Sequence, residues 1–177
     1  MFRNIQLVIC VLLVSSCMDE VDFNQLDDFS ATPKYVASLA HFTFNQNQFV
    51  TNLGTEQNVL SDVAPLQIKS DFIQNYLANF LIQFTVTNSF NRPITLVLRF
   101  YNANSQPILA LNPITIPPNT VNKTYYQNLS GADLANFKNS AATRLDVVLG
   151  AGAPINTAIS QTLNVQISGI FDFNIYH

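Results

Sequence analysis

The C-terminal stretch "LNVQISGIFDFNIYH", residues 163–177, decides the fold class. Large apolar side chains recur at every second position, and polar side chains such as Gln166 and Asp172 lie between them. A period of two indicates a strand with one buried face and one exposed face. Gly169 interrupts the apolar series, and we expect a β-bulge there because so long a strand has to bend.

The same alternation recurs upstream. Residues 79–88 place Phe80, Ile82, Phe84 and Val86 on one face, and residues 94–101 alternate in the same way. The turn-forming stretch "NSFNRP" separates these two strands, and "NANSQP" leads into a third, "ILALNPITI". We expect the three strands to form an antiparallel meander. Weaker strand signals lie at residues 35–44, 66–70, 122–129 and 143–150.

Helical signals are few and short. In "SGADLANFKNS", Ser130 stands three residues before Asp133, which resembles a capping box and predicts a helix of about two turns with Leu134 and Phe137 inward. The stretch "DFIQNYL" permits one further helical turn. Seven or eight strands with one short connecting helix predict an all-β fold, an antiparallel β-sandwich.

This strand pattern resembles the immunoglobulin-like and fibronectin-like modules of bacterial surfaces. The likeness concerns architecture, because the chain has no tryptophan for the conserved core position of immunoglobulin domains and no spaced cysteine pair within the strands. We find no internal repeat and no second domain, so residues 35–177 are expected to form a single sandwich domain.

The N-terminal stretch "MFRNIQLVICVLLVSSC" has one early positive charge, a short apolar run and small residues before a cysteine, the layout of a secretory signal peptide. The run is shorter than the roughly 20 residues of a membrane-spanning helix. The four residues Val14, Ser15, Ser16 and Cys17 resemble the lipobox of bacterial lipoproteins. The resemblance implies removal of residues 1–16 and a lipid anchor on Cys17. An ordinary signal peptide or an uncleaved anchor are the alternatives.

An acidic stretch, "MDEVDFNQLDDF", follows the cysteine. Its first acids, Asp19, Glu20 and Asp22, resemble the export signal of Bacteroidota surface lipoproteins. The resemblance implies a location in the outer membrane facing the cell surface, with the periplasmic face as the alternative. Without the resemblance, residues 17–34 are interpreted as an acidic, solvated, flexible tether.

Charge excludes one class of partner. Without residues 1–16 the eight basic side chains become seven, against eleven acidic ones, so the net charge changes from −3 to −4. Nucleic-acid binding needs clustered Lys and Arg, and no such cluster occurs in the sequence. The polar surface is rich in amides, which could hydrogen-bond sugars or reflect a compositional bias.

Catalytic and metal-binding patterns are weak, so we expect no enzyme, no metal and no cofactor. His41 lies in an apolar strand and His177 ends the chain, and there is no G-x-S-x-G elbow. Both cysteines lie in the leader or its cleavage site, which leaves no disulfide or cysteine metal site. Only six acids follow the tether, and a glycosidase would need two of them beside each other.

Exposed tyrosines are the remaining candidates for contacts with a ligand or a protein partner: Tyr101, Tyr125, Tyr126 and Tyr176. Tyrosines on a sheet can anchor a partner or stack on a sugar, and they also pack against cross-strand neighbours. The sequence therefore supports a non-catalytic, lipid-anchored outer-membrane protein that acts as an accessory or structural subunit of a cell-envelope complex. The alternative is a surface module that binds polysaccharide.

Overall fold

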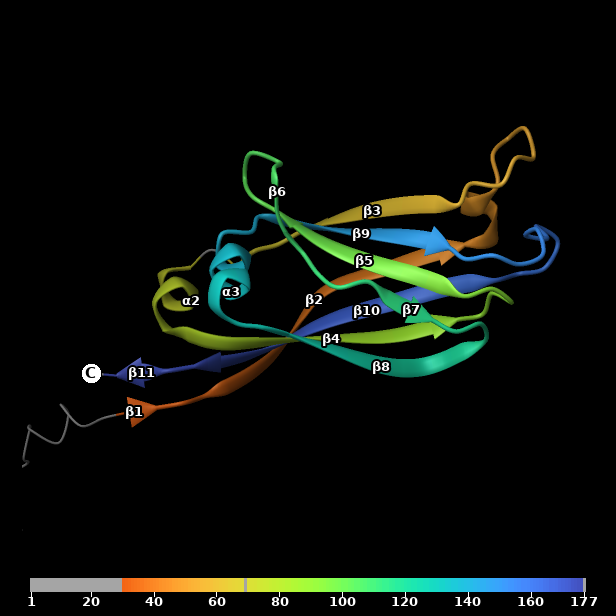
Figure 1. Cartoon of the computed structure of the whole chain (residues 1–177). Helices are drawn as coiled ribbons and strands as arrows, with labels where there is room; N and C mark the ends of the chain where they lie inside the picture. The colour runs from red at the N-terminus through yellow and green to blue at the C-terminus, as the bar shows by residue number, and fades with distance from the viewer. Residues whose placement is uncertain (1–29, 69, 177) are drawn as a thin grey trace, which may run out of the picture. The chain divides into compact units, whose positions relative to one another are not determined.

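The computed structural model describes residues 30–68 and 70–176, which divide into two units. The larger unit, residues 32–174, is a sandwich of two antiparallel sheets (Figure 1). The smaller unit contains the short strands β1 (Ser30–Ala31) and β11 (Ile175–Tyr176), which pair antiparallel. Ser30 and Ala31 are thus hydrogen-bonded in a strand at the end of the stretch interpreted above as a tether.

Within its described residues, the sandwich contains nine strand segments and three short helices. In chain order they are β2 (Lys34–Asn45), the 3₁₀ helix η3 (Gln46–Phe49), β3 (Val59–Pro65), α2 (Asp71–Tyr76), β4 (Leu77–Asn88), β5 (Ile94–Tyr101), β6 (Pro107–Ala110), β7 (Ile114–Ile116), β8 (Thr120–Leu129), α3 (Gly131–Lys138), β9 (Ala142–Leu149) and β10 (Thr162–Phe173).

The strand order is that of a jelly roll. One sheet has the order β2-β10-β4-β8, and the other has β3-β9-β5-β6, with β7 also pairing with β5. Because β6 and β7 pair with opposite ends of β5, they are two pieces of one interrupted strand. Eight strands in two four-stranded layers, with most successive strands changing sheet, define this architecture.

The expected β-sandwich is confirmed, and its connectivity differs from the immunoglobulin order. In an immunoglobulin domain the first two strands are neighbours in one sheet. Here β2 and β3 lie in opposite sheets, as do β4 and β5. The meander predicted for residues 79–116 is therefore wrong in its first pairing, because the tight turn after Asn88 crosses between the layers.

The core consists of the inward positions predicted by the alternation. Burial alternates without a break along β5 and β10, and along β4 from Phe80 onward. Phenylalanine fills the centre, and seven of these rings are almost completely buried: Phe42, Phe49, Phe80, Phe84, Phe90, Phe100 and Phe137. Each such ring contributes about 1.5–3 kcal/mol relative to an exposed one, so this core can stabilise the domain without a disulfide.

The bulge predicted at Gly169 does not occur there, because Gly169 pairs regularly with Ala37 and the register shift lies opposite Ile167 and Ser168. Ile167 pairs with Ala40 and Ser168 pairs with Ser38, so Leu39 is the extra residue and the bulge belongs to β2. Gly169 has a different role, because a Cβ atom there would lie 2.4 Å from a ring carbon of Phe80. The absent side chain leaves room for the aromatic core.

Two further local predictions need correction. The strand expected at residues 66–70 is wrong, because β3 ends at Pro65 and is an outer strand with no buried residue. The two helices lie where expected, with Leu134 and Phe137 of α3 buried. Ser130 makes no side-chain cap for α3, whereas Ser70 caps α2 by accepting a 3.2 Å hydrogen bond from the Ile73 amide.

Candidate functional site

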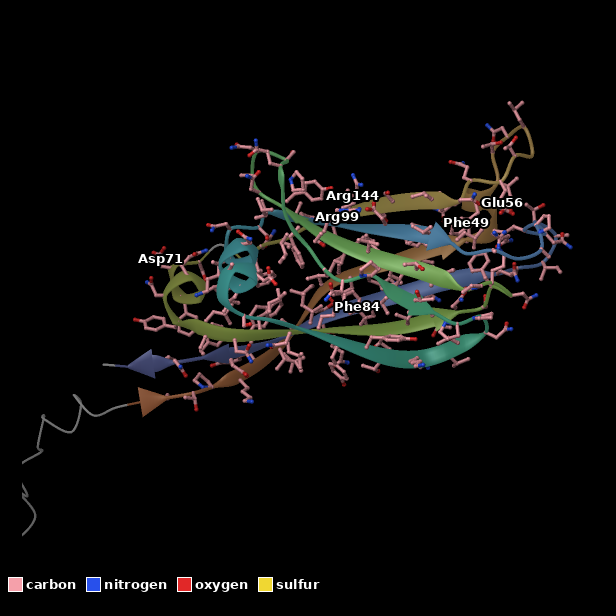
Figure 2. All side chains as sticks on the ribbon, viewed as in Figure 1. Phe49, Glu56, Asp71, Phe84, Arg99 and Arg144 are labelled. Carbon is pink, nitrogen blue, oxygen red and sulfur yellow. The ribbon has the colours of Figure 1, made fainter. Side chains whose placement is uncertain are left out.

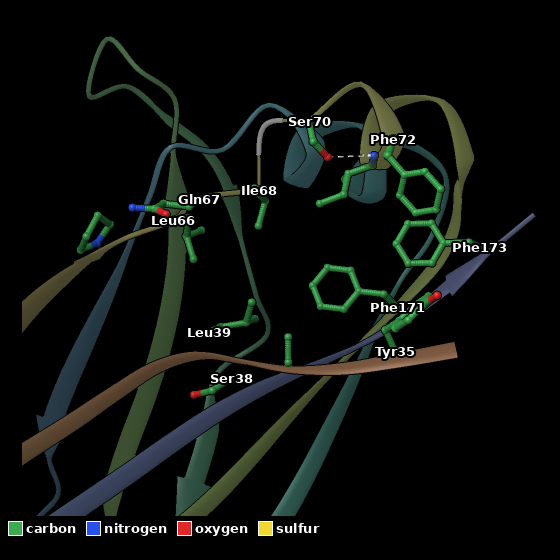
Figure 3. Close-up of a pocket in the computed structure, with 13 residues that line it drawn as sticks. Tyr35, Ser38, Leu39, Leu66, Gln67, Ile68, Ser70, Phe72, Phe171 and Phe173 are labelled. Atoms are coloured by element: carbon green, nitrogen blue, oxygen red, sulfur yellow. Dashed lines mark hydrogen bonds between the residues drawn. The ribbon is translucent and has the colours of Figure 1, made fainter. Parts of the chain in front are cut away.

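A groove of about 570 Å³ opens between β2 and the segment that joins β3 to α2 (Figure 3). This volume lies within the range of known ligand pockets, about 300–1,000 Å³. Apolar side chains line most of it, together with three polar residues, Ser38, Gln67 and Ser70. The groove is therefore suited to apolar groups rather than to charged ones.

Aromatic rings form one end of the groove. Phe72 from α2 packs on Phe173 from β10 with a centroid distance of 4.7 Å, and Tyr35 from β2 meets Phe173 edge to face at 5.7 Å. Phe171 completes this end (Figure 3). Tyr35 is 56% exposed and Phe72 is 41% exposed, so two large apolar surfaces face solvent at one place.

The opposite wall comes from the chain between β3 and α2. Leu66 and Ile68 point into the groove from this wall, facing Leu39 of β2 (Figure 3). Leu66 and Ile68 are buried against the core, which fixes the wall in place. The Ser70 cap then holds the start of α2, and with it Phe72, at the end of the same wall.

The bulge in β2 determines which of its side chains line the groove. Beyond Leu39, Ala37 pairs with Gly169 and Tyr35 pairs with Phe171, both of which face the interior. Tyr35 and Ala37 therefore point into the groove, and Val36, 71% exposed, points to the opposite face of the sheet.

The edge of β2 beside the groove is interrupted by the bulge at Leu39, but from Tyr35 to Ala40 it has no charge or proline against pairing. Outer strands are normally blocked by charges or prolines. Among the described strands, β3 has Asp62 on the interior side, β8 has Lys123 there, and β6 begins at Pro107. Residues 35–40 of β2, "YVASLA", contain neither a charge nor a proline, and β2 pairs only with β10 among the strands described.

The opposite side of the sandwich is closed by a side chain. Gln127 of β8 accepts a 3.1 Å hydrogen bond from the backbone amide of Asn112 and donates a 2.7 Å hydrogen bond to its carbonyl. Its amide group thereby joins β8 to the break between β6 and β7, one strand from each sheet. The sandwich is therefore linked on this side and grooved on the other.

An ion pair fixes the loops between strands. Arg92 is 8% exposed and donates to a Glu56 carboxylate oxygen at 2.5 Å and to the Gly150 carbonyl at 2.7 Å. Glu56 also accepts from the Ile155 amide at 3.0 Å. The hydrogen bond from Arg92, aided by that from Ile155, lowers the pKa of Glu56 below its ordinary value of 4.5. These hydrogen bonds hold the loops around Glu56, Gly150 and Ile155 together.

The tyrosines singled out from the sequence do not form one site. Tyr101 lies on the outer face of β5, with the guanidinium of Arg144 5.7 Å from its ring centroid. Tyr125 of β8 packs against the core, and its hydroxyl group has no hydrogen-bond partner among the residues that the structure describes. Tyr126 points outward and is 58% exposed. The side chain of Tyr176 lies outside the described part of the structure, although its backbone belongs to β11.

The other sequence candidates have separate positions. His41 is exposed on β2 and contacts the Thr43 hydroxyl group at 3.1 Å. Three carboxylates pair with different cations: Glu56 with Arg92, Asp172 with Lys34 at 3.6 Å, and Asp146 with two arginines. Within residues 30–68 and 70–176, no three His, Cys, Asp or Glu side chains cluster as a metal site would require. Asp62 lies in β3.

The anchor and export residues lie outside the described residues: Val14, Ser15, Ser16, Cys17, Asp19, Glu20 and Asp22, together with His177. Among the helices that the structure describes, none has the length and hydropathy needed to cross a membrane. Sequence reasoning missed the groove, because its walls come from residues 35–39, 65–68, 70–73 and 171–173, which are far apart in the sequence. The sequence feature that could have indicated the groove is the uncharged run "YVASLA", residues 35–40, in what the structure shows to be an outer strand.

Comparison with known proteins gives no family. No family model matches the chain, and no curated protein matches it. Solved structures with a similar fold include a Parabacteroides distasonis protein whose name assigns it to the secreted proteins, 12% identical over 64% of this chain and 38% of that one, with a TM-score of 0.49. PfGH50B is 15% identical over 80% and 22% of the two chains, with a TM-score of 0.46.

A structure of Triatoma virus is 15% identical over 92% of this chain and 72% of its own, with a TM-score of 0.45. The matched regions cover less than two fifths of the Parabacteroides protein and less than a quarter of PfGH50B. At such identities and TM-scores, none of these proteins transfers an activity or a partner to this chain.

Proposed function

We propose that this chain is a non-catalytic lipoprotein of the bacterial outer membrane and an accessory subunit of a cell-envelope complex. In this proposal the groove beside β2 binds an extended, apolar segment of a partner protein. The lipid anchor is Cys17, and the acidic residues behind it direct the domain to the cell surface. The observation that carries the proposal is the combination of an uncharged free strand edge with an aromatic groove on its interior side.

Strand addition explains both features together. A partner segment that pairs with residues 35–40 would satisfy the free backbone groups of β2, and its alternate side chains would enter the groove. Backbone hydrogen bonds provide affinity in such complexes, and the pocket selects the side chains. Tyr35 and Phe72, which are exposed in the free domain, would become buried against the partner.

The anchor has a physical rationale of its own. Two acyl chains are the minimum for stable membrane attachment, because one chain binds only reversibly. A lipoprotein cysteine carries two or three chains, which meets this requirement. Replacement of Cys17 by alanine should abolish labelling with fatty acid and release the protein from the membrane fraction, and unchanged labelling would contradict the anchor.

The test of the groove is affinity purification of the tagged chain from its native membrane in mild detergent, with quantification of the proteins that co-purify. A stoichiometric envelope protein is expected with the wild type. Ala37→Arg fills the groove with a charged side chain and should remove that partner. Val36→Gln is the control at the neighbouring position, because its side chain points to the opposite face and adds no charge to the strand edge, so the partner should stay bound. Isolation of the wild type alone, or equal partner recovery with both variants, would contradict the proposal.

A further inference from the structure

Two arginines lie side by side on the outer face of the sheet that contains β3, β9, β5 and β6. Arg99 of β5 and Arg144 of β9 are direct cross-strand partners, and Figure 2 shows both above these strands. Like charges in directly opposite positions destabilise a sheet. The pair therefore requires a negative group between the two guanidinium groups.

That negative group is Asp146, whose side chain is only 6% exposed. One carboxylate oxygen accepts from Arg144 Nε at 2.8 Å and from the Ser61 hydroxyl group at 2.6 Å. The other accepts from Arg144 Nη2 at 3.3 Å and is in contact with Arg99 Nη1. A carboxylate has about four acceptor positions, so the four donors use its capacity.

The two guanidinium groups keep N–H donors and positive charge that Asp146 does not use. Two positive charges share one negative charge, and the salt bridges within the described ranges give them no second carboxylate. The side chains of Arg99 and Arg144 are 34% and 38% exposed, and each guanidinium has five N–H donors. Tyr101 lies against Arg144 and helps to fix the plane of its guanidinium group.

From this cluster we infer an anion-binding site for the carboxylate groups of an acidic polysaccharide. Arginine binds planar carboxylates through two parallel hydrogen bonds from its guanidinium group. Asp146 holds both guanidinium groups in position before the ligand arrives. The site lies on a different surface from the groove, so it does not depend on the proposed partner.

The position of the cluster favours a sugar over an acidic peptide. Both arginines stand on inner strands, because β5 pairs with β9 and with β6 and β7, and β9 pairs with β3. A peptide laid across this face would meet no free backbone groups. A sugar chain can instead bond to side-chain hydroxyl groups, such as those of Tyr101 and the Thr95–Thr115 pair, and rest a ring on an aromatic side chain.

The test measures binding of the purified full chain to polygalacturonate by titration calorimetry. Dextran serves as the neutral polysaccharide and poly-glutamate as the acidic peptide. We expect binding of polygalacturonate that weakens with added salt, as expected for partly exposed charges, and no binding of dextran. Arg99→Gln should weaken polygalacturonate binding by about tenfold, the value for one lost charge-assisted contact.

The matched control is Lys123→Gln, which removes the same charge from an exposed position on β8 of the other sheet and should change the affinity by less than about twofold. If Arg99→Gln does not fold, Arg99→Lys retains the ion pair with Asp146 but loses the fork, and should also bind more weakly than the wild type. Absence of polygalacturonate binding, or equal losses in the Arg99 and Lys123 variants, would overturn the site. Equal affinity for poly-glutamate would overturn the choice of a sugar.

Discussion

Replacement of Gly169 by alanine should destabilise the domain, although glycine-to-alanine changes in strands are usually neutral or favourable. The new Cβ atom would lie 2.4 Å and 2.7 Å from two ring carbons of Phe80, and 2.8 Å from a ring carbon of Phe171. Favourable carbon contacts lie at about 3.5–4.0 Å, so a ring must move by roughly 1 Å. Phe80 cannot yield easily, because it is fully buried and stacks on Phe137 with a centroid distance of 4.0 Å.

The magnitude follows from two opposing effects. Overpacking in a close-packed core costs about 1–3 kcal/mol. Alanine also reduces the conformational freedom of the unfolded chain, which stabilises the folded state by about 0.4–1 kcal/mol. The net loss should be about 1–2 kcal/mol, which lowers the melting temperature of a domain of this size by roughly 2–8 °C. Urea unfolding and thermal unfolding followed by circular dichroism measure both quantities.

Two controls identify the cause. Ser168→Ala, at the adjacent position on the outer face, should change the free energy of unfolding by less than about 0.5 kcal/mol. Adding Phe80→Leu should reduce the cost of Gly169→Ala by at least about 0.5 kcal/mol, because the smaller side chain makes room for the Cβ atom. A Gly169→Ala variant that melts at or above the wild-type temperature would refute the explanation given for this glycine.

Three further perturbations test the core, the loops and the anchor. Phe137→Ala removes the fully buried ring that joins α3 to the core and should cost about 3–5 kcal/mol in urea unfolding; a loss below about 1 kcal/mol would contradict the packing. The lowered pKa of Glu56 means that its pair with Arg92 stabilises the fold above the ordinary pKa, and that this contribution is lost as the pH falls through the folded value. The wild type should therefore lose more stability than Glu56→Gln between about pH 7 and pH 3 in parallel unfolding curves, and identical losses would count against the pair. A Cys17→Ala protein should appear in the soluble fraction after cell breakage, and its retention in the membrane would argue for a different attachment.

The strands and most of the core could be predicted from local sequence. Alternation in residues 79–88, 94–101 and 163–173 identified the inward side chains correctly, because side-chain direction in a strand depends only on its period of two. Leu134 and Phe137 were recognised for a similar local reason. β3 was missed because an outer strand buries few residues, so its sequence has no clear alternation.

The order of the strands and the candidate sites could not be predicted in this way. The turn after Asn88 has the composition of a hairpin, yet it joins opposite sheets, and nothing in its residues distinguishes the two cases. The groove brings together residues 35–39 and 171–173, which are neighbours only because β2 pairs with β10. Arg99 and Arg144 are likewise adjacent only through the pairing of β5 with β9.

The extra residue in β2 also has an evolutionary consequence. Because Leu39 is the unpaired residue, its deletion would leave the pairs of β2 with β10 in register, so Ala40, Phe42 and Phe44 would stay in the core and Tyr35 and Ala37 would still face the groove. A deletion of one codon would thus remove one apolar side chain from the groove wall while the rest of the sandwich kept its packing. Related genes could gain or lose this part of the groove lining in a single mutational step, without passing through a misfolded intermediate sequence.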